Sequence, residues 1–380
     1  MQAIINGKLI LPHSVEEKHI LVFNDTIQAI ETADKFNPKD YDQVFDAKGN
    51  YVAPGFFNIH IHGINGADAM DENPASIGKM AEALPSTGVT DFLPTTMTYD
   101  SSRISIALTN IRQAQNLQTG ALVRGANLEG PFISSQYKGA QAEKYIQKAD
   151  FALLAPFKDV IKILTLAPET LPDAGFIETC VDNDIIVSLG HSAATYEQAL
   201  DALRAGASHI THLFNAMSPL HHRAPGLVGV GLDTHVKCEL IADNIHVHPA
   251  VQRLVFKAKA PENIILITDS MRACLLGDCE SDLGGQKVYV KNGKATLADG
   301  SMAGSVAPMN QVVANFKTNT RADWSTVINM VTLNPAIEFG LDDQIGSLET
   351  KKLANLTIFD ENCTIQQTFI KGTLYHPGRF

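Results

Sequence analysis

The chain lacks the features that mark secreted, membrane-spanning and nucleic-acid-binding proteins. Its 380 residues include five cysteines, an odd number without a Cys-x-x-Cys pair, which is typical of reduced thiols in a cytoplasm. No apolar run approaches the roughly 20 residues that a membrane span needs, and no basic segment followed by an apolar one opens the chain. Acidic residues outnumber basic ones by 41 to 30, and the formal net charge of -11 argues against general nucleic-acid binding. We therefore expect a cytoplasmic protein with no nucleic-acid and no membrane partner.

Apolar sequence, in contrast, is present in an amount that suffices for more than one domain. A hydrophobic content of 45% over this length allows one large α/β domain and a smaller one. Residues 1–52 and 341–380 have the pattern of short strands, with a hairpin predicted at Asn6-Gly7. Each end is too small to fold alone, so we expect the two ends to pair as one small β-sandwich domain. The body, residues 53–340, would then be an insertion between them.

The body alternates strand-like and helix-like segments. Helices are expected, for example, at residues 76–86, 101–116, 196–205 and 249–259. Strands joined by crossover helices favour an α/β fold of the (β/α)8 TIM-like barrel type, in which active sites form at the carboxyl ends of the strands. An open doubly wound sheet is the alternative, but it collects ligands only at a switch point. The apolar runs that we expect to be barrel strands lie near residues 55–62, 89–95, 124–129, 161–167, 185–191, 208–213, 236–242 and 264–268.

Five of these runs end in residues that can bind a divalent metal. The residues are His60 with His62, Glu129, His191, His212 and Asp269. Two histidines two residues apart on a strand share a face, so both can point into the barrel. A glutamate that ends a buried strand needs a partner, because a buried carboxylate is costly. Imidazole and carboxylate ligands without a thiolate suit a catalytic zinc, iron or manganese centre better than a structural zinc.

Ordinary structural explanations also exist for several of these residues. His60 and His62 could be half-exposed strand histidines, and Asp269 could be a helix N-cap, a common position for aspartate. His209 lies three residues before His212, so it faces the other way, and we expect it to be structural. The convergence of several strand ends on one point nevertheless favours the metal site.

At this stage several longer segments resemble the amidohydrolase superfamily, and within it the deacetylases of amino-sugar phosphates. The segments run in the family's order between residues 53 and 340, and the stretch from Thr211 to Gly226 is the most specific. The matching segments are 53–56, 127–132, 138–141, 189–192, 211–218, 220–226, 241–246, 268–270, 302–305 and 332–336.

The resemblance implies metal-dependent removal of acetate from N-acetylglucosamine 6-phosphate by a homodimer. It implies that Glu129, His191 and His212 hold the main metal and that Asp269 acts as general base and then general acid. His60 and His62 would hold a second ion bridged by Glu129. One or two divalent ions are expected, zinc first, with iron, manganese and cobalt as alternatives. Substrate contacts are implied for Ala140, Gln141, Asn215, Ala216, Arg223, His246, Met302, Ala303 and Gly304.

The chain departs from the family pattern at two positions, and alternatives stay open. Asn58 stands where the superfamily commonly has aspartate, and Gln141 stands where some deacetylases have histidine. N-acetylgalactosamine 6-phosphate is an alternative substrate. A cyclic-amide hydrolase would typically need a carboxylated lysine at a strand end, whereas Lys162 lies near the start of its strand. A sugar-phosphate-binding protein without activity is the remaining alternative.

Overall fold

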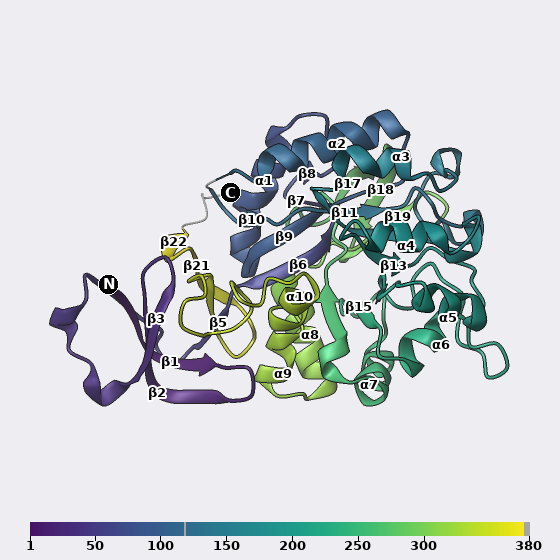
Figure 1. Cartoon of the computed structure of the whole chain (residues 1–380). Helices are drawn as coiled ribbons and strands as arrows, with labels where there is room; N and C mark the ends of the chain where they lie inside the picture. Colours follow the sequence, from purple (N-terminus) through teal and green to yellow (C-terminus); the bar gives the residue numbers. More distant parts are fainter. Residues whose placement is uncertain (118, 376–380) are drawn as a thin grey trace.

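A barrel of parallel strands forms the centre of the molecule, of which the computed structural model describes residues 1–117 and 119–375 (Figure 1). Successive strands pair in parallel around the barrel, and the two-residue strand β10 (Leu122–Val123) pairs with β9. The TIM-like barrel and all eight expected strands are confirmed. The barrel strands are β6 (Phe56–Ile61), β9 (Val89–Thr96), β11 (Ala126–Glu129), β12 (Ile161–Leu166), β13 (Ile186–Leu189), β14 (His209–Ile210), β15 (Lys237–Ile241) and β16 (Ile264–Ile267).

The first and last barrel strands meet through backbone hydrogen bonds. The Asp269 N–H donates to the His60 carbonyl at 3.0 Å, and the His62 N–H donates to the Ser270 carbonyl at 2.9 Å. Next to this seam, the buried Asn58 amide donates to Thr268 Oγ1 at 2.8 Å. Closure of the barrel therefore brings Asn58 and Thr268, which are 210 positions apart in the chain, to one strand end.

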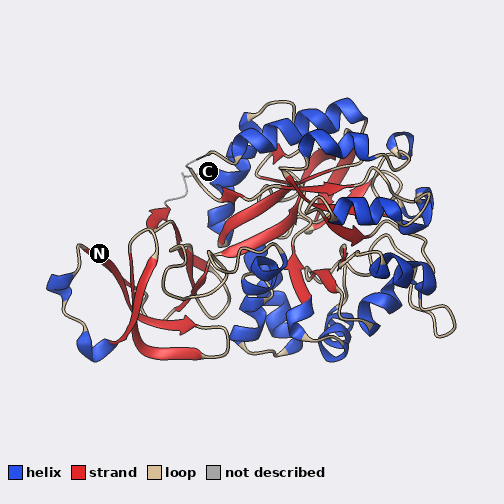
Figure 2. Cartoon of the chain, in the orientation of Figure 1, coloured by secondary structure: helices blue, strands red, loops and turns tan. Residues whose placement is uncertain are grey.

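Helices surround the barrel (Figure 2), and the four predicted helices are confirmed as α1, α2, α5 and α7. Local sequence explains where they begin: Thr195 and Gln198, for example, form a capping box at the start of α5. Within the described part of the chain, no helix is long and apolar enough to cross a membrane. The α-helices are α1 (Ala75–Ala83), α2 (Ser101–Ala114), α3 (Phe151–Leu154), α4 (Gly175–Val181), α5 (Tyr196–Arg204), α6 (Gly226–Asp233), α7 (Pro249–Ala258), α8 (Met309–Thr320), α9 (Trp324–Asn329) and α10 (Leu333–Glu338).

The two ends of the chain build one mixed sheet beside the barrel, as expected (Figure 1). The N-terminal and C-terminal parts join where β5 pairs with β20, and Phe23, Val52 and Phe369 are among the side chains in their shared core. The division into 1–52 plus 341–380 and 53–340 stays a proposal, and residues 376–380 lie outside the described part. The strands are β1 (Gln2–Ile10), β2 (Val15–Phe23), β3 (Ile27–Thr32), β4 (Gln43–Asp46), β5 (Tyr51–Pro54), β20 (Leu356–Phe359), β21 (Ile365–Ile370) and β22 (Thr373–Tyr375).

The hairpin predicted at Asn6-Gly7 is wrong, because the pair forms a bulge inside the continuous strand β1. The register between β1 and β2 shifts from Ile4 to Gly7, and Asn6 has a φ of 54°. A hairpin turn and a bulge both use a residue that tolerates positive φ, so the dipeptide does not distinguish them. Glycine is required here for space, since a Cβ on Gly7 would lie 2.6 Å from Val52 Cγ2.

Two insertions stand at the carboxyl ends of the barrel strands. A hairpin of β7 (Gly63–Ile64) and β8 (Ala67–Asp68) follows β6, and a three-stranded flap follows β16. Arg272 contacts both insertions, because its Nη2 lies 3.7 Å from Asp68 of the hairpin and its Nε lies 3.4 Å from Asp282 of the flap. The flap strands are β17 (Cys279–Leu283), β18 (Gln286–Lys291) and β19 (Lys294–Leu297).

Candidate metal centre and active site

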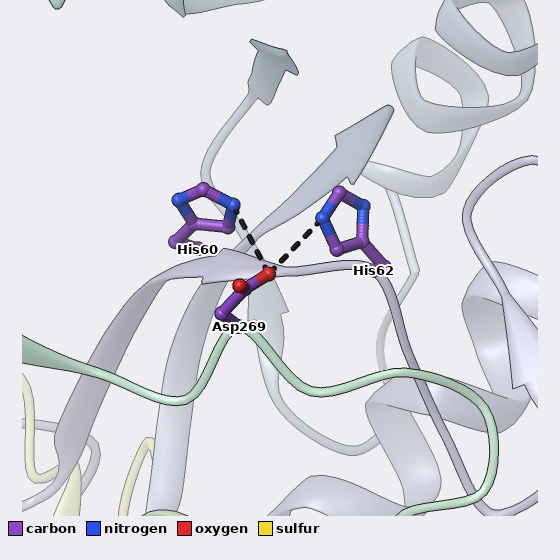
Figure 3. A group of neighbouring side chains, drawn as sticks. All are labelled: His60, His62 and Asp269. Carbon is purple, nitrogen blue, oxygen red and sulfur yellow. Dashed lines mark ion pairs between the residues drawn. The ribbon is translucent and has the colours of Figure 1, made fainter. Parts of the chain in front are cut away.

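His60, His62 and Asp269 form one buried group of potential metal ligands at the barrel seam (Figure 3). His60 and His62 come from the end of β6, and both rings point toward the Asp269 carboxylate, which follows β16. Asp269 Oδ1 lies 3.4 Å from His60 Nε2 and 3.2 Å from His62 Nε2. The two histidines share one face of the strand, as the spacing predicts.

Glu129, His191 and His212 form a second buried group next to the first. Glu129 Oε1 lies 3.1 Å from Nε2 of both His191 and His212, and these two nitrogens are 3.2 Å apart. Glu129 also reaches the first group, with Oε1 3.5 Å from His60 Nε2 and Oε2 3.4 Å from His62 Nε2. One carboxylate therefore lies between the two sets of ligands.

Hydrogen bonds at the far side of the rings fix which nitrogen faces the site. His62 Nδ1–H donates to the Thr95 carbonyl at 3.1 Å, and His191 Nδ1–H donates to the Tyr137 carbonyl at 2.9 Å. Because a carbonyl can only accept, the proton of each neutral ring is on Nδ1. The lone pair on Nε2 is then free for a metal.

The chemistry of the donor atoms fits a divalent metal. Among the residues that the structure describes, the buried His60 Nε2 has no hydrogen-bond partner, although it faces two carboxylates. An unpaired buried nitrogen is costly unless a ligand satisfies it. Each group offers two imidazole nitrogens and a carboxylate oxygen, the set typical of catalytic zinc, iron and manganese centres.

Both central carboxylates are ionised at neutral pH. Burial opposes ionisation of Glu129, but His191 and His212 outweigh it and hold the pKa of Glu129 well below its ordinary value. Burial opposes ionisation of Asp269 too, and nearby His60 lowers its pKa. The carboxylates can therefore act as ligands or, in the case of Asp269, as a proton acceptor.

Three of the residues at strand ends have a strained backbone. His191, His212 and Asp269 have φ angles of 48°, 29° and 49°, in the left-handed region that non-glycine residues rarely adopt. Strain of this kind costs on the order of 1–3 kcal/mol per residue and clusters at functional sites. Gly190 allows the adjacent strands to approach, because a Cβ there would lie 2.7 Å from the Thr211 Cβ.

A pocket of about 310 Å³ opens over the two groups of ligands. Both carboxylates line it, together with His62, His191 and His212, whereas His60 lies below its surface. Of the residues predicted to contact substrate, those that line the pocket are Ala140, Gln141, Asn215, Ala216, His246, Met302 and Gly304.

Two of the predicted substrate residues do not line this pocket. Ala303 is fully buried behind Met302, and its N–H donates to the Ala295 carbonyl at 3.2 Å. Arg223 is exposed on a turn, where its Nη1 lies 2.7 Å from His222 Nε2. Within one chain, therefore, Arg223 is not brought together with the other predicted residues.

Comparison with known proteins bears on what such a site does. The profile described as the amidohydrolase family matches residues 51–375. The chain belongs to the amidohydrolase family. Amidohydrolases are metal-dependent hydrolases, so the resemblance seen in the sequence and the expected metal dependence are confirmed.

Several individual proteins within this family are similar to the chain over most of its length. A Bacillus subtilis (strain 168) protein, N-acetylglucosamine-6-phosphate deacetylase, is 40% identical over 357 residues, which are 91% of this chain and 90% of its own. An Escherichia coli O157:H7 protein, N-acetylgalactosamine-6-phosphate deacetylase, is 37% identical over 337 residues, 87% and 89% of the two chains. The crystal structure of the Pasteurella multocida N-acetylglucosamine-6-phosphate deacetylase superposes with a TM-score of 0.93 at 32% identity, covering 98% and 99% of the chains.

Two features of this amidohydrolase site differ from what the sequence led us to expect. Gln141 contacts the candidate ligand Glu129, because its Nε2 donates to Glu129 Oε2 while its Oε1 accepts from the Thr98 N–H at 2.9 Å. The flap, which no sequence motif predicted, adds Leu283 to the pocket wall. The amide of Gln141 therefore holds the Glu129 carboxylate in place as well as lining the pocket.

Glu239 is the residue of this amidohydrolase that the sequence reasoning missed. It lies in β15 with a fully buried side chain, and its Oε2 accepts from His60 Nδ1 at 2.9 Å. Its other oxygen is 3.5 Å from Nε2 of the buried His209, the histidine that we expected to be structural. A signal was present, because Glu239 stands within an apolar run between Cys238 and Leu240, and a buried carboxylate needs a partner.

Proposed function

We propose that this chain removes the acetyl group from N-acetylglucosamine 6-phosphate, giving glucosamine 6-phosphate and acetate. The observation that carries the proposal is the Glu129 carboxylate between two groups of buried histidines on the floor of a pocket. The relatives of this chain in Bacillus subtilis and Pasteurella multocida, which are deacetylases of this sugar phosphate, support the choice of substrate. We further propose that the reaction takes place in the cytoplasm.

The residues at the pocket floor have complementary roles in this proposal. Glu129, His191 and His212 would hold one divalent ion, and His60 and His62 would hold a second one close to Glu129. A bound ion supplies positive charge that eases deprotonation of water and polarises the acetyl carbonyl. Asp269 takes the proton from the attacking water and then delivers it to the departing amine nitrogen. Its carboxylate lines the pocket and lies 3.2 Å from His62 Nε2, which supports this role.

The walls of the pocket hold the sugar phosphate in this proposal. Asn215, Ala216, His246 and the Met302–Gly304 loop surround the space above the ligands. The His246 ring is fixed by Asp243, whose Oδ2 lies 2.6 Å from Nδ1. Burial opposes protonation of His246, but Asp243 outweighs it and raises the pKa of the ring, which favours binding of a phosphate dianion.

We propose that Arg223 serves the phosphate site of the neighbouring subunit in a homodimer. Its exposure on a turn outside the pocket of its own chain supports this placement. An acidic protein that binds a phosphate dianion needs locally focused positive charge, and arginine offers a bidentate fork. Zinc is the proposed metal, and iron, manganese and cobalt fit the same donor atoms.

Two other activities have specific observations for or against them. The relative from Escherichia coli supports N-acetylgalactosamine 6-phosphate as a second candidate substrate. A cyclic-amide hydrolase with a carboxylated lysine between two metals is disfavoured. Lys162 lines a separate cavity of about 400 Å³ together with Phe57 and Arg124, away from the ligands, and Glu129 occupies the position between the metal sites.

The decisive experiment compares acetate release from three sugars by the same metal-analysed protein. We expect turnover of N-acetylglucosamine 6-phosphate, slower turnover of the galacto epimer, and at least tenfold lower kcat/KM for unphosphorylated N-acetylglucosamine. Faster turnover of the galacto epimer would mean that N-acetylgalactosamine 6-phosphate, and not N-acetylglucosamine 6-phosphate, is the preferred substrate. No acetate release from any of them by protein that contains metal would refute the proposed activity.

A further inference from the structure

A buried chain of carboxylates and imidazoles leads from the metal ligand His60 through the barrel. Oε2 of Glu239 accepts from His60 Nδ1 at 2.9 Å and from the His212 backbone N–H at 3.0 Å. Its Oε1 faces His209 Nε2 at 3.5 Å, and His209 Nδ1 faces Glu338 Oε1 at 3.4 Å. A single carboxylate thus contacts one residue from each of the two groups of ligands.

The distances indicate which of these contacts matters for the site. A carboxylate that served only as the counter-charge of His209 would make its shorter contact with that ring. Instead, the contact with His60 is shorter by more than half an ångström and has the length of a charge-assisted hydrogen bond. Because an ionised carboxylate can only accept, the His60 proton is on Nδ1 and its Nε2 faces Glu129 and Asp269.

His60 differs from His62 and His191 in the group that accepts the hydrogen bond of its Nδ1. His62 and His191 donate to neutral backbone carbonyls, whereas His60 donates to a fully buried carboxylate. A carboxylate partner makes the opposite imidazole nitrogen a better electron donor to a metal and also fixes the orientation of the ring. The orphaned Nε2 of His60 is the atom that gains from this arrangement.

We propose that Glu239 is a positioning residue for the second metal site, which it supports through the hydrogen bond to His60. The inference rests on the proposed function, in which a second divalent ion binds at His60 and His62. It adds that the affinity for this ion depends on Glu239. Glu239 does not line the pocket, so it acts through His60 and not on the substrate.

The test is a metal titration of the full-length protein with cobalt and zinc at chelator-buffered free concentrations. We expect E239A to bind one of its two ions 10- to 100-fold more weakly, the usual effect of losing such a partner. E239Q should lose less, because its amide oxygen can still accept from His60. In an H60A background, E239A should cause no further loss, since the residue through which it acts is gone.

A matched control is available in Asp91, another buried carboxylate on a barrel strand. Asp91 pairs with Arg124 at 2.6 Å and contacts none of the ligands, so D91N should keep both ions even where it lowers the thermal midpoint. If E239A fails to fold, the comparison of E239Q with D91N decides the same question. The absorption bands of bound cobalt, which report coordination directly, should change in E239Q and not in D91N.

Several results would overturn the inference. One is an unchanged affinity for both ions in E239A or E239Q, and another is an equal loss of metal affinity in D91N. A further loss of metal affinity when E239A is added to H60A would also contradict it, as would binding of only one ion by the wild type. None of these bears on acetate release, so the proposed activity stands or falls separately. Conversely, two bound ions without turnover would refute the activity and leave the role of Glu239 intact.

Discussion

The protonation of His209 makes the stability of this protein depend on pH in a direction that can be measured. The ring is fully buried and lies between two carboxylates, Glu239 of β15 and Glu338 of α10. Burial opposes protonation, but these two acids outweigh it and raise the pKa of His209 from 6.5 to about 9. The folded protein therefore keeps a proton on His209 over a pH range in which the unfolded chain has lost it.

The sign and size of the effect follow from linkage. Because the pKa is raised in the folded state, the stabilisation is fully present below about pH 6.5 and is lost as the pH rises to about 9. A tenfold change in proton affinity is worth about 1.4 kcal/mol, so the whole loss is roughly 3 kcal/mol. This is a large part of the 5–15 kcal/mol that typically stabilises a folded protein.

The assay is denaturant unfolding of metal-free protein between pH 6 and 9.5 for the wild type and H209Q. Other groups also make the stability depend on pH, and the difference between the two proteins removes their contributions. One of these groups is His62: burial lowers the pKa of its ring, but Asp269 and Glu129 outweigh burial and raise that pKa well above its ordinary value. The stability advantage of the wild type should shrink by roughly 3 kcal/mol as the pH rises. Substitution of the exposed His13, as in H13Q, should leave the wild-type profile unchanged. A pH-independent difference between wild type and H209Q would refute the reasoning.

Three further predictions concern the site. Asp269→Asn should lower kcat by about 10²- to 10⁴-fold while metal content stays at or above one ion, and near-normal turnover would contradict its role in proton transfer. In Gly63→Ala the new Cβ would lie 2.6 Å from the Arg272 backbone nitrogen, so the variant should be less stable by about 1–3 kcal/mol in thermal unfolding. The same shift of the backbone should weaken metal binding at the adjacent His62. Gly78→Ala, with only Leu117 nearby at 3.7 Å, is the control and should be neutral or stabilising. Removal of metal should lower stability by about 2.7 kcal/mol relative to protein held at 100 times the Kd, and identical unfolding curves would argue against a metal site in the fold.

Much of the fold was predictable because its signals are local. The eight barrel strands are short apolar runs, and helix starts such as Thr195 are marked by capping residues. The candidate ligands were predictable for a related reason. In a parallel barrel all carboxyl ends of strands meet at one face, so that Glu129 and His191, for example, must lie near each other once the topology is known.

Other features could not be predicted because they depend on pairings between distant residues. The dipeptide Asn6-Gly7 is compatible with either a hairpin turn or a bulge, and the bulge fits the close packing of β1 against β5. The contacts of Glu239 join it to His60, 179 positions away in the chain, and no spacing rule connects them. Arg223 belongs to a specific sequence motif, yet only the structure shows that it stands on an exposed turn outside its own pocket.

The sequence by itself determined the barrel, the shared sheet of the chain ends and the candidate ligand residues at the strand ends. These follow from periodicity and from a topology in which strand ends converge, so short segments carry the information. The tertiary structure alone decided which carboxylate holds which histidine. A buried acid is stabilised by whatever donor the closed barrel places within about 3 Å of it. That is why the sequence marks Glu239 only as a buried acid in need of a partner, and the folded structure identifies that partner as His60.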